Sequence, residues 1–239
     1  MEFRRRTNSL LLGNGTELMK TSVIYRSSWL YEACVLALYR SGYRERYSAL
    51  AELIPANTSV VDICCGPATL YFGYLRHKQV RYTGLDISPT FVQQLLRRGV
   101  NGLLWDVHSS EAFPVADYIV MQGSLYQFLP DPANIVGRML AAATRQVIIS
   151  EPVRNLADSK NPLLRRLSQK LTNAGTGDQM NRFNEGLFHR FLEPYRLTGQ
   201  LVALYSIAAG REKVCVLDVR PEPGRKPASK SSAGRTGAG

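Results

Sequence analysis

The chain of 239 residues is 45% hydrophobic and carries a formal net charge of +11, so it can bury one substantial core in one main domain. Its longest apolar run, from about Ala33 to Tyr39, is far below the roughly 18 residues that a membrane span needs, and its basic start lacks the long apolar region of a signal peptide. Its four cysteines form no C-x-x-C pair, which argues against a disulfide framework or a structural zinc site, and we expect a cytoplasmic protein.

Predicted strands and helices alternate along most of the chain. From Trp29 to Leu53, apolar residues recur at three- and four-residue spacing, which predicts a helix. Apolar and β-branched segments then predict five strands, at 59–64, 80–87, 103–107, 117–121 and 146–150. Helices are expected at 68–76, 89–98 and 134–143, the second with Ser88 as its N-cap and Pro89 at its first position. This alternation predicts parallel pairing with helices on both faces of the sheet.

The end of the chain departs from this alternation. Leu197–Tyr205 and Lys213–Val219 are predicted strands, and the short SIAAGRE segment between them cannot hold a crossover helix. The two strands therefore predict a hairpin. We expect an α/β fold with a seven-stranded, mostly parallel sheet that ends in an antiparallel hairpin.

The basic charge is spread over the chain and its end. Residues 221–239 are rich in Pro, Gly, Ser and Ala, carry four Lys or Arg against one Glu, and predict a disordered basic tail. Residues 1–24 are interpreted as an N-terminal extension and residues 25–220 as the main domain. The scattered charge favours a solubilising surface, with weak contact to anionic membrane or RNA as the alternatives.

The stretch VVDICCGPATL, residues 60–70, ends a predicted strand in an acid and a turn of small residues. In open α/β sheets, ligands lie beyond the carboxyl ends of the strands, where the strand order reverses. Gly66 would let a ligand approach the backbone closely at this point. The turn has one glycine and a proline where dinucleotide folds have G-x-G-x-x-G, so it disfavours a pyrophosphate ligand.

The segment DICCGPA, residues 62–68, resembles the first motif of class I S-adenosylmethionine-dependent methyltransferases, usually D/E-x-G-x-G-x-G. It is similar to the Cys-Cys-Gly variant of quinone-type C-methyltransferases, with Ala68 in place of the third glycine as a mild departure. GLDIS at 84–88, the pair at 106–107 and MQGSLY at 121–126 resemble the second, third and fourth motifs, each at the end of a predicted strand. The resemblance covers about residues 25–219 and implies a Rossmann-like domain with S-adenosylmethionine as its cofactor.

The resemblance also implies where the cofactor is bound. The acid of the second motif would accept both ribose hydroxyls, the third motif would meet the adenine edge, and the fourth would lie beside the methyl group. The residues carried over in this way are Asp62, Cys64, Gly66, Asp86, Ile87, Asp106, Val107 and Gln122. Taken singly, Asp62 could cap its turn and Asp86 the next helix, but together they lie where one cofactor needs them. Because Cys64 and Cys65 are adjacent and point apart, we interpret them as packing residues rather than metal ligands.

The predicted reaction is an in-line displacement that transfers a methyl group to a small-molecule acceptor. The sequence has no Asn/Asp-Pro-Pro-Tyr segment of base-nitrogen methylation, no Pro-Cys nucleophile and no acidic cluster for a metal. Acceptor-specific residues are expected in an insertion at about 153–195. That insertion is interpreted as a lid, as a helix packed on the sheet edge, or as a surface that touches anionic lipid.

Tyr126, after the fourth strand, and His189, in the insertion, are the catalytic candidates, although a lone helical histidine is more often structural. Glu151, Arg154 and Tyr25 are further polar groups expected near the acceptor. Two other functions stay open. One is methylation of RNA or protein, favoured by the basic charge and the tail. The other is a non-catalytic partner protein that binds S-adenosylmethionine.

Overall fold

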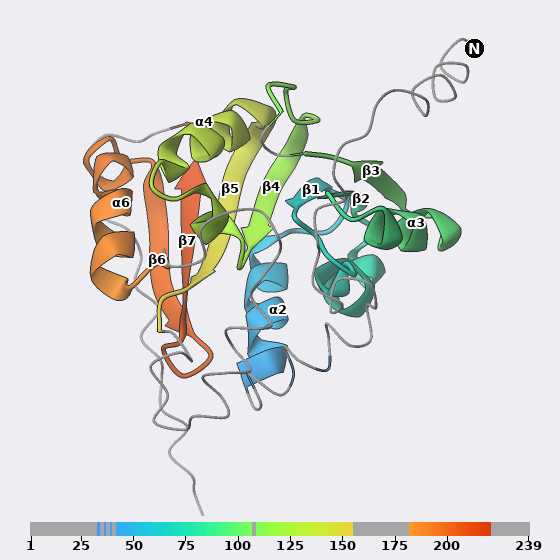
Figure 1. Ribbon diagram of the computed structural model, residues 1–239, viewed down its shortest axis with the longest axis horizontal. Coiled ribbons are helices and arrows are strands. Elements are labelled where there is room, and N and C mark those ends of the chain that lie inside the picture. The colour runs from blue at the N-terminus through green and yellow to red at the C-terminus, as the bar shows by residue number, and fades with distance from the viewer. Residues whose placement is uncertain are drawn as a thin grey trace, which may run out of the picture.

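The structure is a computed structural model that describes residues 42–106, 109–154 and 182–220, together with residues 33, 36 and 39. Its framework is a seven-stranded sheet in the order β3-β2-β1-β4-β5-β7-β6, flanked by helices (Figure 1). The strands are β1 (Ser59–Ile63), β2 (Arg81–Asp86), β3 (Asn101–Leu104), β4 (Ala116–Gln122), β5 (Ala143–Pro152), β6 (Leu201–Ile207) and β7 (Glu212–Asp218). The helices are α2 (Gly42–Leu53), α3 (Pro89–Arg97), α4 (Pro132–Ala142) and α6 (Glu185–Leu197), with short helical turns η2 (Tyr71–Leu75), η3 (Arg76–Lys78) and η4 (Leu125–Phe128).

The strand directions confirm the predicted fold class. The pairs β1–β2, β1–β4, β2–β3 and β4–β5 are all parallel. Strand β7 is antiparallel to both of its neighbours, with Cys215 opposite Ile149 of β5 and opposite Leu204 of β6. The hairpin of β6 and β7 therefore closes the sheet as the short connection predicted.

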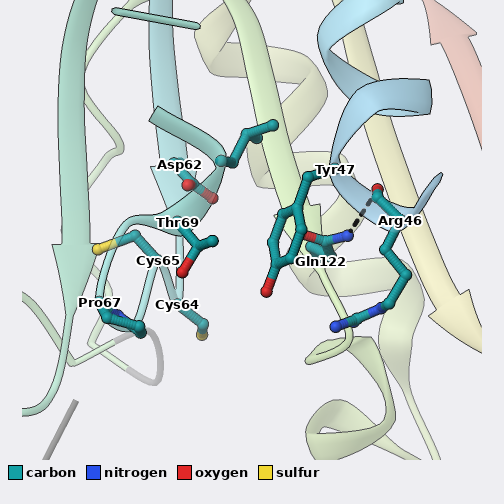
Figure 2. Close-up of a pocket in the computed structure, with 9 residues that line it drawn as sticks. Arg46, Tyr47, Asp62, Cys64, Cys65, Pro67, Thr69 and Gln122 are labelled. Carbon is teal, nitrogen blue, oxygen red and sulfur yellow. Dashed lines mark hydrogen bonds between the residues drawn. The ribbon is translucent and has the colours of Figure 1, made fainter. Parts of the chain in front are cut away.

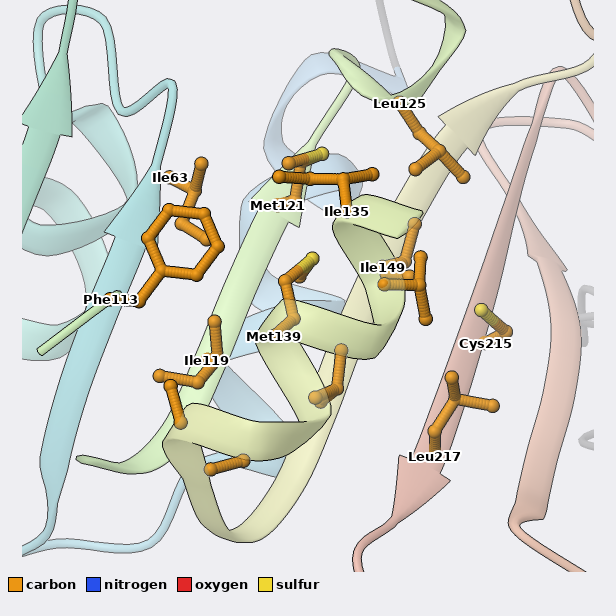
Figure 3. Close-up of a cluster of buried hydrophobic side chains, with 14 of the residues drawn as sticks. Ile63, Phe113, Ile119, Met121, Leu125, Ile135, Met139, Ile149, Cys215 and Leu217 are labelled. Carbon is orange, nitrogen blue, oxygen red and sulfur yellow. The ribbon is translucent and has the colours of Figure 1, made fainter. Parts of the chain in front are cut away.

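Apolar side chains of the central strands are buried on both faces of the sheet, as expected for parallel strands covered by helices. On one face, β4 and β5 pack against α4 in a first core (Figure 3). Helix α6 contributes Phe188 and Leu192 to the same core. Met139 of α4 and Phe188 of α6 are fully buried in it. Successive strand residues alternate between the faces, so Ile149 lies in the first core and Ile148 in the second.

The second core lies on the opposite face and joins α2 to the sheet. Leu50 of α2 and Leu75 of η2 are fully buried there. Tyr47 of α2 stacks on Tyr74 with ring centroids 5.7 Å apart. This core fixes α2 against the strands whose ends carry the predicted cofactor residues.

Several predicted boundaries were wrong, and β5 begins at Ala143 rather than at 146. Strand β3 covers 101–104 rather than 103–107, because its pairing with β2 begins at Asn101 and ends at Leu104. Gly102 packs closely on α3, where an added Cβ would lie 3.0 Å from the Leu95 side chain. The segment predicted as helix 68–76 contains the π-helical turn η2 and the 3-10 turn η3, and it ends where Gln79 adopts a left-handed φ of 56°. The sixth strand starts at Leu201 rather than Leu197, because Leu197 is the last residue of α6.

Several predicted segments lie outside the described residues. These are the extension at 1–24, the tail at 221–239 and residues 155–181 of the predicted lid. Within the described part of the chain, no helix combines the length and the apolar character that crossing a bilayer would require.

Candidate functional site

The carboxyl ends of β3, β2, β1 and β4 lie side by side, because these strands are adjacent and parallel. The chain proceeds outward from β1 to β3 and then returns to the other side of β1 with β4, so the strand order reverses between β1 and β4. Open α/β sheets bind ligands at such a position. Asp86 and Gln122 are the last residues of β2 and β4, and Asp62 is the next to last of β1. Asp106 follows two residues after β3. The predicted Val107 lies outside the described residues.

The turn of residues 62–68, here called the motif turn, explains why the family prefers glycine at its three motif positions. Cys64, Gly66 and Ala68 adopt left-handed backbone conformations, with φ of 57°, 55° and 56°. A non-glycine residue in this region costs about 1–2 kcal/mol. The chain thus keeps the backbone of the glycine-rich motif with only one glycine. The non-glycine residues Cys64 and Ala68 are therefore strained, and such strained positions cluster at active sites and ligand-binding sites.

Asp86 ties the motif turn to the next turn of the edge. One carboxylate oxygen accepts a hydrogen bond from the Gly66 N–H and the other from the Ser88 N–H, each at 2.8 Å. Burial raises the pKa of Asp86, and these two N–H donors oppose the shift. A carboxylate has about four lone-pair directions, so the Asp86 oxygens can still accept ligand hydroxyls. The predicted N-cap Ser88 makes no side-chain cap bond, so its backbone N–H serves Asp86 rather than its hydroxyl serving α3.

Asp62 is buried in the sheet. The alternative prediction that it caps its own turn is not supported, because its carboxylate binds a neighbouring strand instead. Its carboxylate accepts a hydrogen bond from the Tyr82 hydroxyl at 2.8 Å, across the β1–β2 pair. Burial raises the pKa of Asp62 to about 7, the Tyr82 bond lowers it, and the nearby charge of Asp86 raises it. A carboxyl whose pKa lies near neutral pH can ionise beside a cationic ligand group and accept a hydrogen bond from it.

An apolar rim lies beyond the ends of β2 and β3. Ile87 and Leu104 are 49% and 61% exposed although both are large and hydrophobic. The Trp105 N–H donates to the Asp86 carbonyl at 3.0 Å and continues the β2–β3 ladder past the end of β3. The exposed Asp106 follows directly. An exposed apolar pair next to an acid offers a platform for a flat ring with polar edges.

A narrow pocket of about 30 Å³ opens between the motif turn and α2 (Figure 2). Asp62, Cys64 and Pro67 line one side, and Arg46 and Gln122 the other. The Gln122 side-chain amide donates to the Arg46 carbonyl at 3.0 Å, which fixes the Gln122 side chain at the pocket wall. The pocket has room for one group the size of a water molecule or an ammonium.

Arg46 and Glu212 form a buried ion pair behind this pocket, which the sequence did not predict. The Arg46 Nε donates to Glu212 Oε2 at 2.6 Å, and the Ser150 hydroxyl donates to Glu212 Oε1 at 2.5 Å. Both charged side chains are almost fully buried. The Tyr39 ring lies over the guanidinium of Arg46, with 4.1 Å between the ring centroid and the guanidinium carbon. The residues are 166 positions apart, so only the fold brings them together.

Tyr126 lies in η4, directly after β4, as the sequence predicted. Burial raises the pKa of its hydroxyl, and the positive charge of Arg182 opposes that shift. The Arg182 guanidinium carbon lies 3.5 Å from the centre of the Tyr126 ring. Glu151, at the end of β5, accepts a hydrogen bond from the Leu125 N–H of the same turn at 2.9 Å. Glu151 therefore contacts the turn that carries Tyr126, and the expected place of both residues near the acceptor stays a prediction.

His189 has a different setting. Helix α6 buries Phe188 and Leu192 and leaves His189 exposed, one turn after Glu185. The Glu185 carboxylate lies 2.7 Å from the Lys213 ammonium. Among the contacts of the described residues, none joins His189 to Tyr126. The catalytic role of His189 stays a prediction, and an exposed helical position is also that of an ordinary surface histidine.

The adjacent cysteines pack on opposite sides of the sheet. Cys64 contacts the first core and Cys65 the second, and both are free thiols. Burial raises the pKa of both thiols, so neither is a ready nucleophile. Within the described ranges no group of three or more histidine, cysteine or acidic side chains could hold a metal ion. The interpretation of the pair as packing residues agrees with these positions.

Comparison with solved structures shows which class of fold this is. The chain matches an O-methyltransferase family protein from Burkholderia thailandensis with a TM-score of 0.58 and 14% identity over 84% of this chain and 61% of that one. It matches human N-acetylserotonin methyltransferase in complex with SAM with a TM-score of 0.54 and 16% identity over 90% and 61% of the chains. It matches the magnesium protoporphyrin IX methyltransferase of Synechocystis with bound SAH with a TM-score of 0.51 and 12% identity, over 86% of this chain and 88% of that one. The chain has the fold of class I S-adenosylmethionine-dependent methyltransferases.

A family model described as methionine biosynthesis protein MetW matches residues 44–161, which include all four predicted motifs. The expected class I methyltransferase fold is therefore confirmed. The chain spans about three fifths of the length of the first two methyltransferases named above. No curated protein matches the sequence.

Proposed function

We propose that the protein binds S-adenosylmethionine at the carboxyl ends of β1 to β4 and transfers its methyl group to a small-molecule acceptor. The observation that carries this proposal is the placement of two carboxylates, Asp62 and Asp86, at the ends of adjacent strands around a strained small-residue turn. A structural role alone explains Asp86 in part, because it fixes two backbone N–H groups. It does not explain why a buried acid ends β1 as well.

The residues on this edge fit the cofactor. Asp86 has unused lone pairs for the ribose hydroxyls, and the apolar rim of Ile87 and Leu104 suits the adenine ring beside Asp106. The narrow pocket between Asp62 and Gln122 suits the ammonium of the methionine part. When bound, the cofactor supplies an electrophilic methyl group on a sulfonium. The protein needs to hold the acceptor in line with that group and to exclude water.

A small-molecule acceptor is supported by the kind of proteins that share the fold. Two of them are named for the methylation of N-acetylserotonin and of magnesium protoporphyrin IX. The predicted lid, the contacts with anionic membrane or RNA and the cytoplasmic location stay predictions. A matched set of experiments with labelled cofactor separates the small-molecule proposal from its alternatives.

The test incubates the full chain with S-adenosylmethionine labelled in its methyl group and a fractionated cell extract. We expect label in the small-molecule fraction, and we expect Asp86→Asn to lose most of it at a limiting cofactor concentration. Label in RNA or protein would replace the proposal by macromolecular methylation. Cofactor binding without label in any fraction would indicate a non-catalytic partner protein.

A further inference from the structure

Glu151 has one carboxylate oxygen without a partner. The side chain is 1% exposed, and its Oε2 accepts the Leu125 N–H at 2.9 Å. Its Oε1 is buried and has no hydrogen-bond partner in the described part of the chain. A buried polar atom that lacks a partner costs about 1–3 kcal/mol, and more when it is charged. Such an atom on the inner side of a candidate active site is a position for a ligand group.

Arg182 has a buried hydrogen-bond donor without a partner. Its guanidinium lies on the Tyr126 ring, with 3.5 Å between the guanidinium carbon and the ring centre. Its Nη2 is buried and, among the residues described, has no partner. Glu151 accepts the Leu125 N–H and Arg182 lies on the Tyr126 ring, so both groups contact the same turn, η4. No hydrogen bond joins Glu151 Oε1 to Arg182 Nη2, because neither atom has a partner in the described part of the chain.

The two groups lie next to the proposed cofactor edge. Ser150, which precedes Glu151, pairs with Gln122 at the end of β4. Ile63, which precedes Cys64 of the motif turn, pairs with Met121 of β4, so the motif turn and η4 follow neighbouring strands. The unpartnered atoms are therefore on the side of the edge where an acceptor would meet the methyl group.

The chemistry of the two atoms selects one kind of acceptor group. The carboxylate oxygen needs a donor, and the guanidinium N–H needs an acceptor. A hydroxyl supplies both, since it has one O–H and two lone pairs. A neutral amine has one lone pair, which the new bond to the methyl group uses, so none is left for Arg182, and a carbon acceptor needs neither partner. Resting on the proposed function, we infer that Glu151 and Arg182 hold the hydroxyl of the acceptor and that the reaction is an O-methylation.

In this step the acceptor O–H bond breaks and its proton passes to Glu151 Oε1. The oxygen forms a bond to the methyl carbon, the carbon–sulfur bond of the sulfonium breaks, and its electron pair stays on sulfur. The products are a methyl ether, S-adenosylhomocysteine and the protonated carboxyl. Arg182 stabilises the negative charge that develops on the acceptor oxygen. Tyr126 holds the guanidinium in place through its ring.

The surroundings of Glu151 give it the pKa that a base needs near neutral pH. Burial raises the pKa of Glu151 to about 8, with the Leu125 N–H lowering it and the charge of Glu212 raising it. The titratable or charged groups that face it are Glu212, Arg182, Cys64, Cys215, Tyr126 and Tyr39. The carboxylate is the active form, so the rate should rise with pH up to about 8 and then level.

The test compares wild type with Glu151→Gln and Arg182→Gln, and Glu185→Gln on the exposed face of α6 is the matched control. Labelled S-adenosylmethionine and the small-molecule fraction of a cell extract serve as substrates. Hot hydriodic acid then releases the label of methyl ethers as volatile methyl iodide. We expect release of the label, a loss of turnover of about 100-fold or more in Glu151→Gln and about tenfold or more in Arg182→Gln, and less than a twofold change in the control.

Two readouts separate this inference from the proposed function. Calorimetry should give Glu151→Gln the affinity of wild type for S-adenosylhomocysteine, within about twofold. Infrared titration should show a protonated carboxyl band in wild type that disappears as the pH rises through about 8. In Glu151→Gln this band should be missing, and the band of Asp62, which titrates near a pKa of about 7, should remain. Label that resists hydriodic acid, or an unchanged rate and pH profile in Glu151→Gln, would overturn the inference while cofactor binding stands. Failure of wild type to bind S-adenosylhomocysteine would overturn the proposed function itself.

Discussion

Replacement of Glu212 by Gln should strongly destabilise the protein, because it leaves the guanidinium of Arg46 buried without its counter-charge. The Glu212 side chain is fully buried and that of Arg46 is 8% exposed. The substitution removes the charge behind a 2.6 Å ion-pair bond and weakens the bond from the Ser150 hydroxyl. Removal of one member of a buried pair costs about 3–5 kcal/mol. For a domain of this size that corresponds to a fall in Tm of roughly 6–20 °C.

Urea unfolding followed by circular dichroism measures this cost, and an unchanged m value shows that the transition is comparable. Glu185→Gln is the matched control, because its pair with Lys213 is largely exposed on the glutamate side and should be worth less than about 1 kcal/mol. The double variant Arg46→Met/Glu212→Met buries no charge and should recover much of the loss. If Glu212→Gln costs no more than the control, the ion pair does not hold α2 on the sheet.

Three further predictions concern the site. Asp86→Asn should weaken the affinity for S-adenosylhomocysteine by one to two decades, about 1.5–3 kcal/mol, and calorimetry of Asp106→Asn should show a much smaller effect. Burial raises the pKa of Asp62 from 3.8 to about 7, so the folded state favours the protonated acid and stability is lost as the pH rises through this range. Asp62→Asn should therefore have a higher Tm than wild type at pH 8 and no advantage at pH 4, and equal differences at both pH values would contradict the buried setting. If His189 approaches the acceptor, His189→Ala should lower turnover and leave cofactor affinity within about twofold, whereas unchanged turnover would make it a surface residue.

The sheet could be predicted because its signals are local. Apolar segments of strand length alternate with helical segments, and the SIAAGRE connection is too short for a helix. The edge of the site followed from the same signals, because an acid at the end of one predicted strand and another at the end of the next must lie on one edge of a parallel sheet. Asp62 and Asp86 are indeed on adjacent strands.

The contacts that the sequence did not reveal depend on long-range packing. Arg46 and Glu212 meet across most of the chain, and neither belongs to a motif. Asn-Gly is a weak strand signal, and β3 starts there because Asn101 and Gly102 pair with Thr83 and Gly84 of β2. The hydrogen bond from Tyr82 to Asp62 and the unpartnered Oε1 of Glu151 are set by burial, which residue types alone do not fix.

Titration calorimetry of the full chain with S-adenosylhomocysteine tests the central claim most directly. We expect saturable binding to one site per chain, weakened in Asp86→Asn, and no measurable binding of NAD, because the motif turn has no glycine-rich seat for a pyrophosphate. Thermal unfolding of the same sample shows that the protein is folded. A folded protein that binds NAD as tightly as S-adenosylhomocysteine, or that binds neither, would contradict the assignment of this edge as a methyltransferase cofactor site.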